Sequence, residues 1–328
     1  MVSHHKGPAS SPAAGPAMGG AGGRVGCTVS AEDAGLRLDA FVARRILGAS
    51  VAATRKWMEQ NPVTVDGRPL AKGHHLAAGQ RVEASAPRHA AVAPNPALGL
   101  DVLYEEAGFV AVNKPAGLPS HPLGAGESDT VASAILARYP ECAGASEDPL
   151  EGGLAHRLDV GTSGVLLAAR TRQDWRALRE VLARGACEKT YLAEVVGTLA
   201  TPPEQGPLVI DAPIGRRGRR SAGVTVGQGR GLLPARTEIR ARARRGETTL
   251  VEAHLSHGRA HQVRAHLAHV GHPVLGDAIY ATPEAAALAE RLGIDGFRLH
   301  ALEIRFAHPF SGRALVIAAP APAWAQTD

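Results

Sequence analysis

The first clear hydrophobic periodicity in the chain comes after about 30 residues that show none. Leu38, Phe41 and Val42 follow helical spacing, which places apolar side chains on one face of a helix. Asn61-Pro62 ends a second helical stretch, since the residue before a proline disfavours helical dihedral angles. The pattern predicts a compact module with helices at 36–47 and 51–60, strands at 63–65 and 76–83, and a hairpin turn at Asp66-Gly67.

A longer series of strand-like and helical stretches follows from about residue 100. The clearest helix starts at Thr171, carries Trp175 on its apolar stripe and ends at Gly185. The other predicted elements are strands at 102–104, 109–112, 165–169 and 191–196 and a helix at 131–139. Strands and helices alternate irregularly, without a sustained βαβ period, so the pattern predicts the α+β fold class.

Composition sets the boundaries between these parts. Residues 1–28 are mostly Gly, Ala, Pro and Ser, which bury too little apolar surface to offset the entropy of ordering, so we expect a disordered tail. Residues 87–99 are rich in Pro and Ala and are expected to form a linker. The chain is therefore expected to contain a small domain at 29–86 and a large domain at 100–328.

Charge and composition narrow the class of protein. Of the 328 residues, 45% are apolar and 20% are charged, as in ordinary globular proteins, and Lys plus Arg exceed Asp plus Glu by 36 to 31. This small excess favours polyanions over cationic ligands. The three cysteines form no CxxC pair, which disfavours a disulfide framework. No apolar run approaches the roughly 20 residues of a membrane span, and no secretory signal is evident, so we expect a cytoplasmic protein.

Two short segments carry candidate chemistry that is weak when each is taken alone. In His156–Gly164, Asp159 stands on a Gly-rich turn two residues after Arg157, and an isolated pair of this kind is more often a surface ion pair. In Glu188–Ala193, Tyr191 begins a predicted strand, where a tyrosine is more often a half-buried sheet residue than a stacking ring. Neither segment identifies an activity by itself.

A third segment, 256–273, predicts a helix with a cation at the edge of its apolar face. Val263 and Leu267 share that face, and Gly271 can end the helix. Arg264 lies at the edge, where its stem can be buried while its head reaches a cleft. A buried guanidinium needs an anion, and a carboxylate matches its planar fork.

The histidines of the same segment leave a metal site open as an alternative. His257 and His261 are four residues apart, and His266, His269 and His272 follow at intervals of three, so metal ligation is conceivable. No cysteine joins them, and no glutamate lies between His257 and His261 to serve as the base of a metalloprotease. We favour a surface facing RNA or solvent, or the capping of carbonyl groups, over a metal site.

An arginine-rich stretch lies between the second and third segments. From residue 214 to residue 245 its one acidic residue is Glu238. Guanidinium groups suit phosphate contacts better than lysine does, so the run favours contact with nucleic acid over a merely solvated face. The arginines are Arg216, Arg217, Arg219, Arg220, Arg230, Arg236, Arg240, Arg242, Arg244 and Arg245.

In combination, these segments resemble the RluA family of RNA pseudouridine synthases. The resemblance covers about 100–320 and implies a mixed, largely antiparallel sheet with a central cleft. The domain at 29–86 resembles a small α+β S4 RNA-binding domain, with its two helices and its hairpin. Four motifs stand in the family's order and spacing, namely Asn113-Lys-Pro-Ala-Gly-Leu-Pro-Ser-His121-Pro122, His156-Arg-Leu-Asp-Val-Gly-Thr-Ser-Gly164, Glu188-Lys-Thr-Tyr-Leu-Ala193, and Gly258-Arg-Ala-His-Gln-Val-Arg-Ala-His266 running into Gly271-His-Pro-Val-Leu-Gly-Asp277.

The resemblance implies that uridine in RNA is isomerised to pseudouridine, in which the base is detached at N1, turned and rejoined through C5. No atom is gained or lost, so no cofactor or metal is required. It implies that Asp159 is the nucleophile or the carboxylate that activates the ribose, and that Arg264 is its ion-pair partner. It also implies that Tyr191 stacks on the target base and is a candidate to help remove the C5 proton. It further implies substrate contacts by His156, Arg157, Thr162, Arg259, His261 and Gln262, and RNA-backbone contacts by Arg55, Lys56, Arg216, Arg217, Arg219 and Arg220.

The physical chemistry of such a site is consistent with these roles. A carboxylate in a water-poor pocket tends to take up a proton, and a fixed arginine keeps Asp159 ionised and nucleophilic. Lys114 and His121 are expected to belong to a structural turn near the cleft. We expect a monomer that acts on ribosomal RNA in preference to transfer RNA. Two alternatives stay open, a non-catalytic RNA-binding or ribosome-associated protein of the same fold and a metal-dependent hydrolase.

Overall fold

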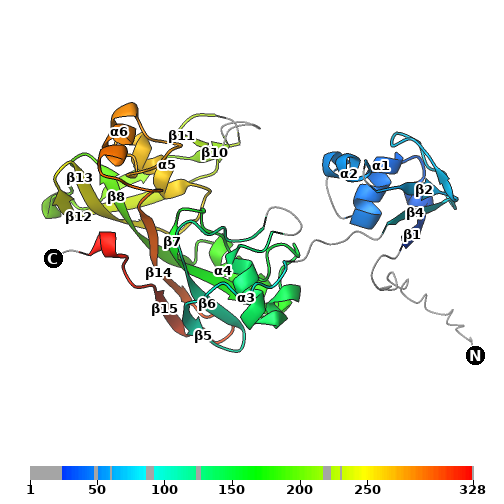
Figure 1. Cartoon of the computed structure of the whole chain (residues 1–328), viewed down its shortest axis with the longest axis horizontal. Helices are drawn as coiled ribbons and strands as arrows, with labels where there is room; N and C mark the ends of the chain where they lie inside the picture. Colours follow the sequence, from blue (N-terminus) through cyan, green and yellow to red (C-terminus); the bar gives the residue numbers. More distant parts are fainter. Residues whose placement is uncertain are drawn as a thin grey trace, which may run out of the picture. The chain divides into compact units, whose positions relative to one another are not determined.

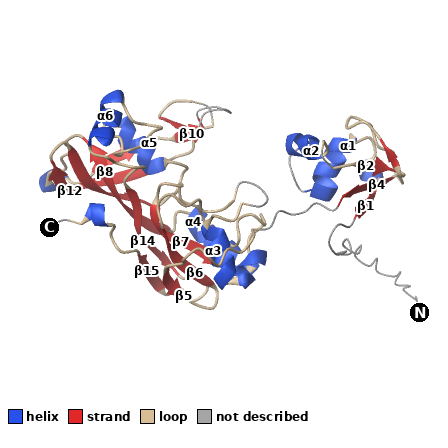
Figure 2. Ribbon diagram, viewed as in Figure 1, coloured by secondary structure: helices blue, strands red, loops and turns tan. Residues whose placement is uncertain are grey.

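A computed structural model shows two compact units in the chain, Met1–His89 and Ala90–Asp328, each with its own sheet (Figure 1). Helices and strands are mixed within each unit, and the larger unit holds most of the strands (Figure 2). Within the part of the chain that is described, no helix is long and apolar enough to cross a membrane. The described residues are 24–47, 51–59, 61–85, 92–122, 127–216, 223–229 and 231–326.

The smaller unit packs short helices on an antiparallel sheet with the strand order β1-β4-β2-β3. Its strands are β1 (Arg24–Thr28), β2 (Val63–Val65), β3 (Arg68–Pro69) and β4 (Arg81–Ser85). Its helical elements are a 3₁₀ turn η1 (Ala31–Asp33), α1 (Leu38–Val42), a π-helical turn η2 (Ala43–Leu47) and α2 (Val51–Trp57).

The core of the smaller unit follows the sequence pattern closely. Leu38 and Phe41 of α1 are fully buried in one cluster with Val82 of β4. The predicted hairpin is also present, because Asp66 and Gly67 both adopt positive φ, 49° and 78°. Two successive residues of this kind form the tight turn whose twist matches the two strands that it joins.

The start of the smaller unit differs from the sequence prediction. Residues 24–28, expected to belong to a disordered tail, form β1 and pair with β4 along their whole length. Composition suggested a tail because these residues bury little apolar surface, but the backbone hydrogen bonds to β4 provide the missing compensation. The remainder of the expected tail, 1–23, lies outside the described residues.

The expected linker also differs in its second half. Val92 is 4% exposed and belongs to a core cluster of the larger unit. The Asn95 side-chain amide donates to the carbonyl of Ser128 at 3.3 Å. Residues 92–99 are therefore packed onto the larger unit, because a single valine and a single amide anchor a segment that composition classed as a spacer.

The larger unit is built on one mixed, mostly antiparallel sheet of nine strands, in the order β5-β6-β7-β14-β8-β13-β12-β9, with β15 paired to β14. A separate two-stranded sheet pairs β10 with β11. The strands are β5 (Val102–Glu105), β6 (Phe109–Lys114), β7 (Ser163–Ala169), β8 (Cys187–Val196), β9 (Leu208–Asp211), β10 (Ile214–Arg216), β11 (Val224–Val226), β12 (Arg236–Arg245), β13 (Thr248–Leu255), β14 (Leu299–Ala307) and β15 (Ala314–Ala318).

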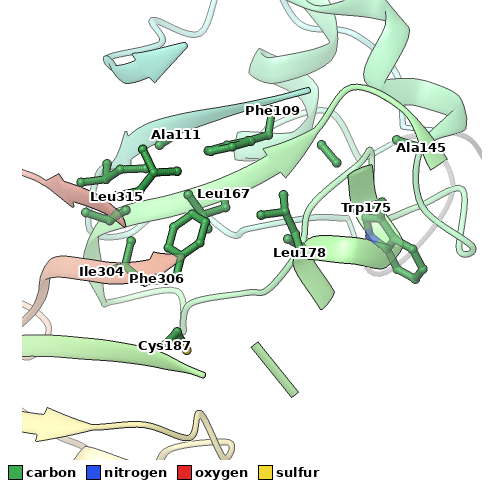
Figure 3. Close-up of a cluster of buried hydrophobic side chains, with 14 of the residues drawn as sticks. Phe109, Ala111, Ala145, Leu167, Trp175, Leu178, Cys187, Ile304, Phe306 and Leu315 are labelled. Atoms are coloured by element: carbon green, nitrogen blue, oxygen red, sulfur yellow. The ribbon is translucent and has the colours of Figure 1, made fainter. Parts of the chain in front are cut away.

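Helices pack on both faces of this sheet. Trp175 and Leu178 of α4 pack on one face in a cluster with Phe109 and Phe306 (Figure 3). Ile135 of α3 belongs to the cluster on the opposite face. The helical elements are α3 (Val131–Arg138), η3 (Pro140–Gly144), α4 (Arg172–Ala183), η4 (Pro203–Gln205), α5 (Gln262–His269), α6 (Pro283–Arg291) and η5 (Ala323–Ala325).

Strand β14 lies in the middle of the sheet although it comes late in the chain. It pairs in parallel with β7 and antiparallel with β8. Gly164 permits the close approach to β7, because a Cβ at this position would lie 2.1 Å from the Ala301 carbonyl oxygen and φ is 109°. Only glycine adopts such a backbone readily, which explains the glycine that ends the His156–Gly164 motif.

Candidate active site

The turn that carries Asp159 is held from below by a buried lysine. The Thr162 N–H donates to the Asp159 carbonyl at 3.0 Å and closes the turn. Lys114, which is completely buried, donates from Nζ to the carbonyls of Pro115, Val160 and Thr162 at 2.7–2.9 Å. Burial lowers the pKa of Lys114 to about 8, and the Asp159 carboxylate opposes this shift. The turn expected around Lys114 therefore supports the turn that carries Asp159.

A guanidinium placed between two carboxylates forms the centre of the site. Arg264, on α5, donates from Nη1 to Asp159 Oδ2 at 2.7 Å. Its other edge makes a bidentate pair with Asp277, with Nε–Oδ2 at 2.6 Å and Nη2–Oδ1 at 2.8 Å. Asp277 is completely buried, and Asp159 keeps 28% of its side chain exposed. The predicted carboxylate partner of Arg264 is thus present, together with a second one.

These contacts keep Arg264 charged in spite of its burial. Burial lowers the pKa of its guanidinium, but the hydrogen bonds and charges of Asp277 and Asp159 outweigh burial, so the pKa is raised. Its plane also lies against the Phe297 ring, with 4.2 Å from Cζ to the centroid. A guanidinium fixed at both edges and on one face cannot rotate away from Asp159.

Tyr191 stands between two core clusters on one face of the sheet. It packs against the cluster that includes Ile135 of α3 and also against the cluster that includes Val263 of α5. A cleft of about 880 Å³ contains Asp159, Arg264 and Tyr191 in its lining. Burial raises the pKa of the Tyr191 hydroxyl, and the charge of Asp159 raises it further. The three residues expected to be catalytic therefore share one concave site.

His261 approaches Asp159 from the start of α5. Its Nε2 lies 3.8 Å from Asp159 Oδ1, and its Nδ1 is 3.0 Å from the Tyr280 hydroxyl. The residue has φ 55°, a left-handed conformation that is uncommon for a side chain of this size. Burial lowers its pKa, although Asp159 opposes the shift. A neutral imidazole thus faces the cleft beside the carboxylate.

The other residues expected to bind substrate also line the cleft, but they differ in how far their side chains are exposed and in whether they are hydrogen-bonded within the protein. Arg157 is exposed, whereas Thr162 is buried beneath the turn. His156 Nε2 accepts from the Leu167 N–H at 3.2 Å, and burial lowers its pKa to about 3, with Lys189 and Arg179 adding to the effect. The residues expected to bind substrate and found in the lining are His156, Arg157, Thr162, Arg259, His261 and Gln262.

Gln262 differs from the others because its side chain is used within the protein. Its Nε2 donates to the Arg236 carbonyl at 3.0 Å and to Thr237 Oγ1 at 3.1 Å, and its Oε1 accepts from the Arg259 N–H at 3.1 Å. This geometry gives Gln262 a positioning role at the start of α5. In the sequence, the only indication of such a role is a glutamine in the first turn of a helix. A glutamine that binds substrate would look the same.

The arginines expected to contact RNA are only partly within the described residues. Arg217, Arg219 and Arg220 lie outside them, and of Arg216 the backbone alone is described, in β10. In the smaller unit, Arg55 is half exposed and pairs with the buried Asp39 at 2.6 Å, and Lys56 is exposed. The later arginines of the run, 236 to 245, belong to β12.

Four of the five histidines considered as metal ligands, all but His269, lie within hydrogen-bond distance of protein oxygens. His266 places Nδ1 at 2.8 Å from Thr237 Oγ1 and Nε2 at 2.9 Å from the Ala212 carbonyl oxygen. His272 Nδ1 lies 3.0 Å from the Val196 carbonyl oxygen. Across the described ranges, no three His, Cys, Asp or Glu side chains are grouped in a way that could hold a metal ion.

Asp277 is the site residue to which sequence reasoning gave no role. It ends the Gly271–Asp277 stretch, and besides Arg264 it accepts from the Ile279 N–H at 2.9 Å. Gly276 permits this turn, because a Cβ there would lie 1.9 Å from the Gly296 carbonyl oxygen. The sequence feature that could have indicated this role is an aspartate directly after a glycine. The same feature is equally typical of a simple turn.

Comparison with known proteins identifies the family of the chain. A family profile described as RNA pseudouridylate synthase matches residues 108–269. The ribosomal large subunit pseudouridine synthase D of Xanthomonas campestris is 36% identical over 302 residues, 88% of this chain and 86% of that protein. The chain belongs to the RNA pseudouridylate synthase family. It is an isomerase that acts on uridine in RNA.

Further relatives of this pseudouridine synthase agree. An uncharacterized RNA pseudouridine synthase of Mycobacterium bovis is 34% identical over 295 residues, 88% of this chain and 92% of that protein. Among solved structures, the human RNA pseudouridylate synthase domain containing 1 covers 70% of this chain and 86% of its own, with a TM-score of 0.55 and 23% identity. This likeness confirms the predicted α+β pseudouridine synthase fold.

Proposed function

We propose that Asp159 is the nucleophilic carboxylate of this pseudouridine synthase, that Arg264 keeps it ionised, and that Tyr191 stacks on the target uracil. The observation that carries the proposal is the 2.7 Å contact between Arg264 and Asp159 inside the cleft. A carboxylate removed from water tends to gain a proton, and a fixed guanidinium reverses that tendency. The partial exposure of Asp159 leaves one side of it open to substrate.

The cleft supports a reaction on a base that has been turned out of its RNA helix. A base inside a helix is unreachable, and everting it costs a few kcal/mol. Stacking on Tyr191 returns roughly 1–3 kcal/mol of this. The exposed Arg157 is placed to fill the gap that the base leaves in the RNA, while His156, Thr162, Arg259 and His261 contact the nucleotide.

We propose that the smaller unit is an S4-like RNA-binding domain. Its two buried carboxylates each hold a pair of half-exposed arginines, so four guanidinium groups are fixed against two negative charges. Asp39 pairs with Arg37 and Arg55, and Asp33 pairs with Arg44 and Arg45, at distances of 2.6–3.4 Å. Such fixed forks suit phosphate oxygens. Arg216, Arg217, Arg219 and Arg220 would add backbone contacts from the larger unit.

We further propose that the RNA is large-subunit ribosomal RNA rather than transfer RNA. The support is that relatives named ribosomal large subunit pseudouridine synthase D align over 88–91% of the chain. An enzyme that modifies ribosomal RNA has to meet its substrate in the compartment that holds the ribosomes, so we propose a cytoplasmic location. We also propose a monomer, and the isomerisation, which neither gains nor loses an atom, balances without a cofactor or a metal.

Replacement of Asp159 by Asn tests the proposal. The amide keeps the shape of the side chain but is not a nucleophile, so we expect no tritium release from RNA labelled at uridine C5, with RNA retention on filters within twofold of wild type. Turnover near wild type in D159N would refute the assignment. A wild-type protein that binds this RNA but releases no tritium would instead favour the alternative of a non-catalytic RNA-binding protein.

A second experiment identifies the RNA. Pseudouridine mapping across total RNA from cells with and without the gene should show sites in large-subunit ribosomal RNA that depend on the gene. Dependent sites confined to transfer RNA would overturn the proposed target while leaving the proposed chemistry intact.

A further inference from the structure

The floor of the cleft holds an amino group that the proposed roles do not use. Lys189, on β8, is 7% exposed and lines both the cleft and a small void beneath it. Among the described residues, no hydrogen bond or ion pair reaches its Nζ. Burial lowers its pKa, and the neighbouring Cys187 thiol opposes the shift. Its Nζ is not among the fully buried atoms that lack a partner, so the amino group is reached from the cleft, where a bound ligand can accept a hydrogen bond from it.

The position of Lys189 relative to Tyr191 is fixed by the strand. The two residues are separated by one position on β8, so their side chains leave the same face of the sheet, with Cα atoms roughly 7 Å apart. A uracil stacked on Tyr191 therefore lies within reach of the Lys189 side chain. Gly258 leaves space for the amino group, because a Cβ at that position would lie 2.9 Å from Nζ.

Depth in the cleft distinguishes a base from a phosphate as the partner of Lys189. The void beside Lys189 is lined mainly by side chains of the sheet, including Val165, Ala301 and Ile304. An RNA backbone that follows the surface meets exposed cations such as Arg157. The everted base is the part of the substrate that extends to the floor, so its oxygens are the groups that meet Lys189.

We propose that the amino group of Lys189 donates a hydrogen bond to a carbonyl oxygen of the target uracil and stabilises the negative charge that uracil carries while it is detached from the ribose. The proposal rests on the function proposed above. As the Asp159 carboxylate bonds to C1′, the C1′–N1 bond breaks, and its electron pair stays on uracil and spreads over N1 and the carbonyl oxygens. After the base has turned, a pair at C5 forms the C5–C1′ bond, and the carboxylate leaves C1′ with the electron pair of its own bond. The proton lost from C5 balances the proton gained at N1, and Lys189 donates throughout without losing its own.

This role strengthens binding in the transition state more than in the ground state. Bound uridine is neutral, and the departing uracil is an anion. A fixed positive donor is worth more against the anion, and it needs no reorganisation when the bond breaks. Removing one such donor from an active site commonly lowers the rate by roughly 100- to 1000-fold.

The test is Lys189→Met in the full-length protein, which keeps the length of the side chain and removes the donor. The readouts are single-turnover tritium release with excess enzyme on total RNA labelled at uridine C5 from cells lacking the gene, filter retention of the same RNA, and the thermal midpoint. We expect the rate to fall about 100-fold or more, RNA retention to stay within twofold, and the thermal midpoint not to fall, since the amino group makes no hydrogen bond or ion pair within the described residues that the change could remove.

Two further variants sharpen the test. Glu188→Gln changes the preceding residue, which is exposed on the other face of β8, and should match wild type in all three readouts. Gly258→Ala should displace the amino group without removing it and lower the rate by a smaller factor. A K189M rate within threefold of wild type would overturn the proposal, as would a lower thermal midpoint with weaker RNA retention, which marks a structural role. Activity in D159N would instead reject the function on which the proposal rests.

Discussion

At the scale of single residues, the site depends on how the hydrogen-bond donors of a buried arginine are shared between two carboxylates. Asp277 takes two donors of Arg264 and has no exposed surface, so it fixes the plane of the guanidinium. Asp159 takes the remaining edge and stays open to the cleft. The first carboxylate is therefore a positioning residue, and the second is the one that can meet substrate.

Replacement of Asp277 by Asn should separate the positioning of Arg264 from the binding of substrate. The amide can accept only part of the bidentate pair, so Arg264 gains freedom to rotate, and small misplacements in an active site cost up to about 100-fold. We expect kcat to fall roughly 10- to 100-fold with KM within threefold of wild type, measured by tritium release. Asp295→Asn, an exposed position in the same part of the chain, serves as the control. A change in KM alone would show that Asp277 acts on RNA binding instead.

The sequence predicts the pair of Asp159 and Arg264 better than it predicts what supports them. A buried arginine beside an apolar helix face demands an anion, and that demand holds in the structure. The same reasoning does not predict the roles of Asp277 and Lys114. An aspartate after glycine and a lysine before proline are common in turns, and nothing local shows that the groups they bind come from distant parts of the chain.

At the scale of elements, the junction of β7 and β14 joins the two halves of the sheet behind the cleft. The strands pair at Ser163 and His300 in parallel, and the two side chains are joined by a 2.8 Å hydrogen bond through His300 Nδ1. His300 is 2% exposed, and its Nε2 has no partner among the described residues. Burial lowers its pKa to about 4, so the ring is neutral in the fold.

Acid should therefore loosen this junction. Between pH 6.5 and about 4 the unfolded chain binds a proton at His300 that the folded chain refuses, so the free energy of unfolding falls as the pH falls. From pH 6.5 to pH 5 the loss is about 2 kcal/mol, at 1.36 kcal/mol per pH unit. His300→Asn should remove that share of the pH dependence, as measured by urea unfolding at the two pH values. An unchanged dependence would mean that other groups, such as His156, account for all of it.

At the scale of the whole molecule, hydrophobic pattern and composition predicted two units and most elements as far as β8, together with the helix α5. They missed the strands β9 to β15 and the helix α6, and they placed two boundaries poorly. Helix and strand periodicity are local properties, and elements such as β2 at 63–65 match their predictions directly. Membership of a sheet is not local. Residues 24–28 are ordered by pairing with β4, and Val92 is ordered by a pocket on the larger unit, so composition alone assigned both to flexible segments.

The arginine pairs of the smaller unit lead to a prediction about salt. The double variant R44Q/R55Q removes one guanidinium from each pair and leaves Arg45 and Arg37 to neutralise the buried carboxylates. If both lost groups contact phosphates, the slope of log K against log salt for RNA should decrease by about two, since each contact contributes roughly 0.9.

The control for this variant is Arg81→Gln, which changes an arginine on the sheet of the same unit. It should leave the slope as in wild type, and the single-turnover rate at saturating enzyme should be unchanged in both proteins. Equal slopes for R44Q/R55Q and wild type would exclude these arginines from the RNA-binding surface.

The central place of β14 has a consequence for synthesis on the ribosome. A nascent chain that has emerged only as far as residue 290 has made β5, β6 and β7 and also β8, β12 and β13, but it lacks the strand that joins these two groups. Asp159 belongs to the first group and Arg264 to the second, so they meet only after the last strands have been translated. The isomerisation that we propose for this pair therefore has to wait until β14 has been translated.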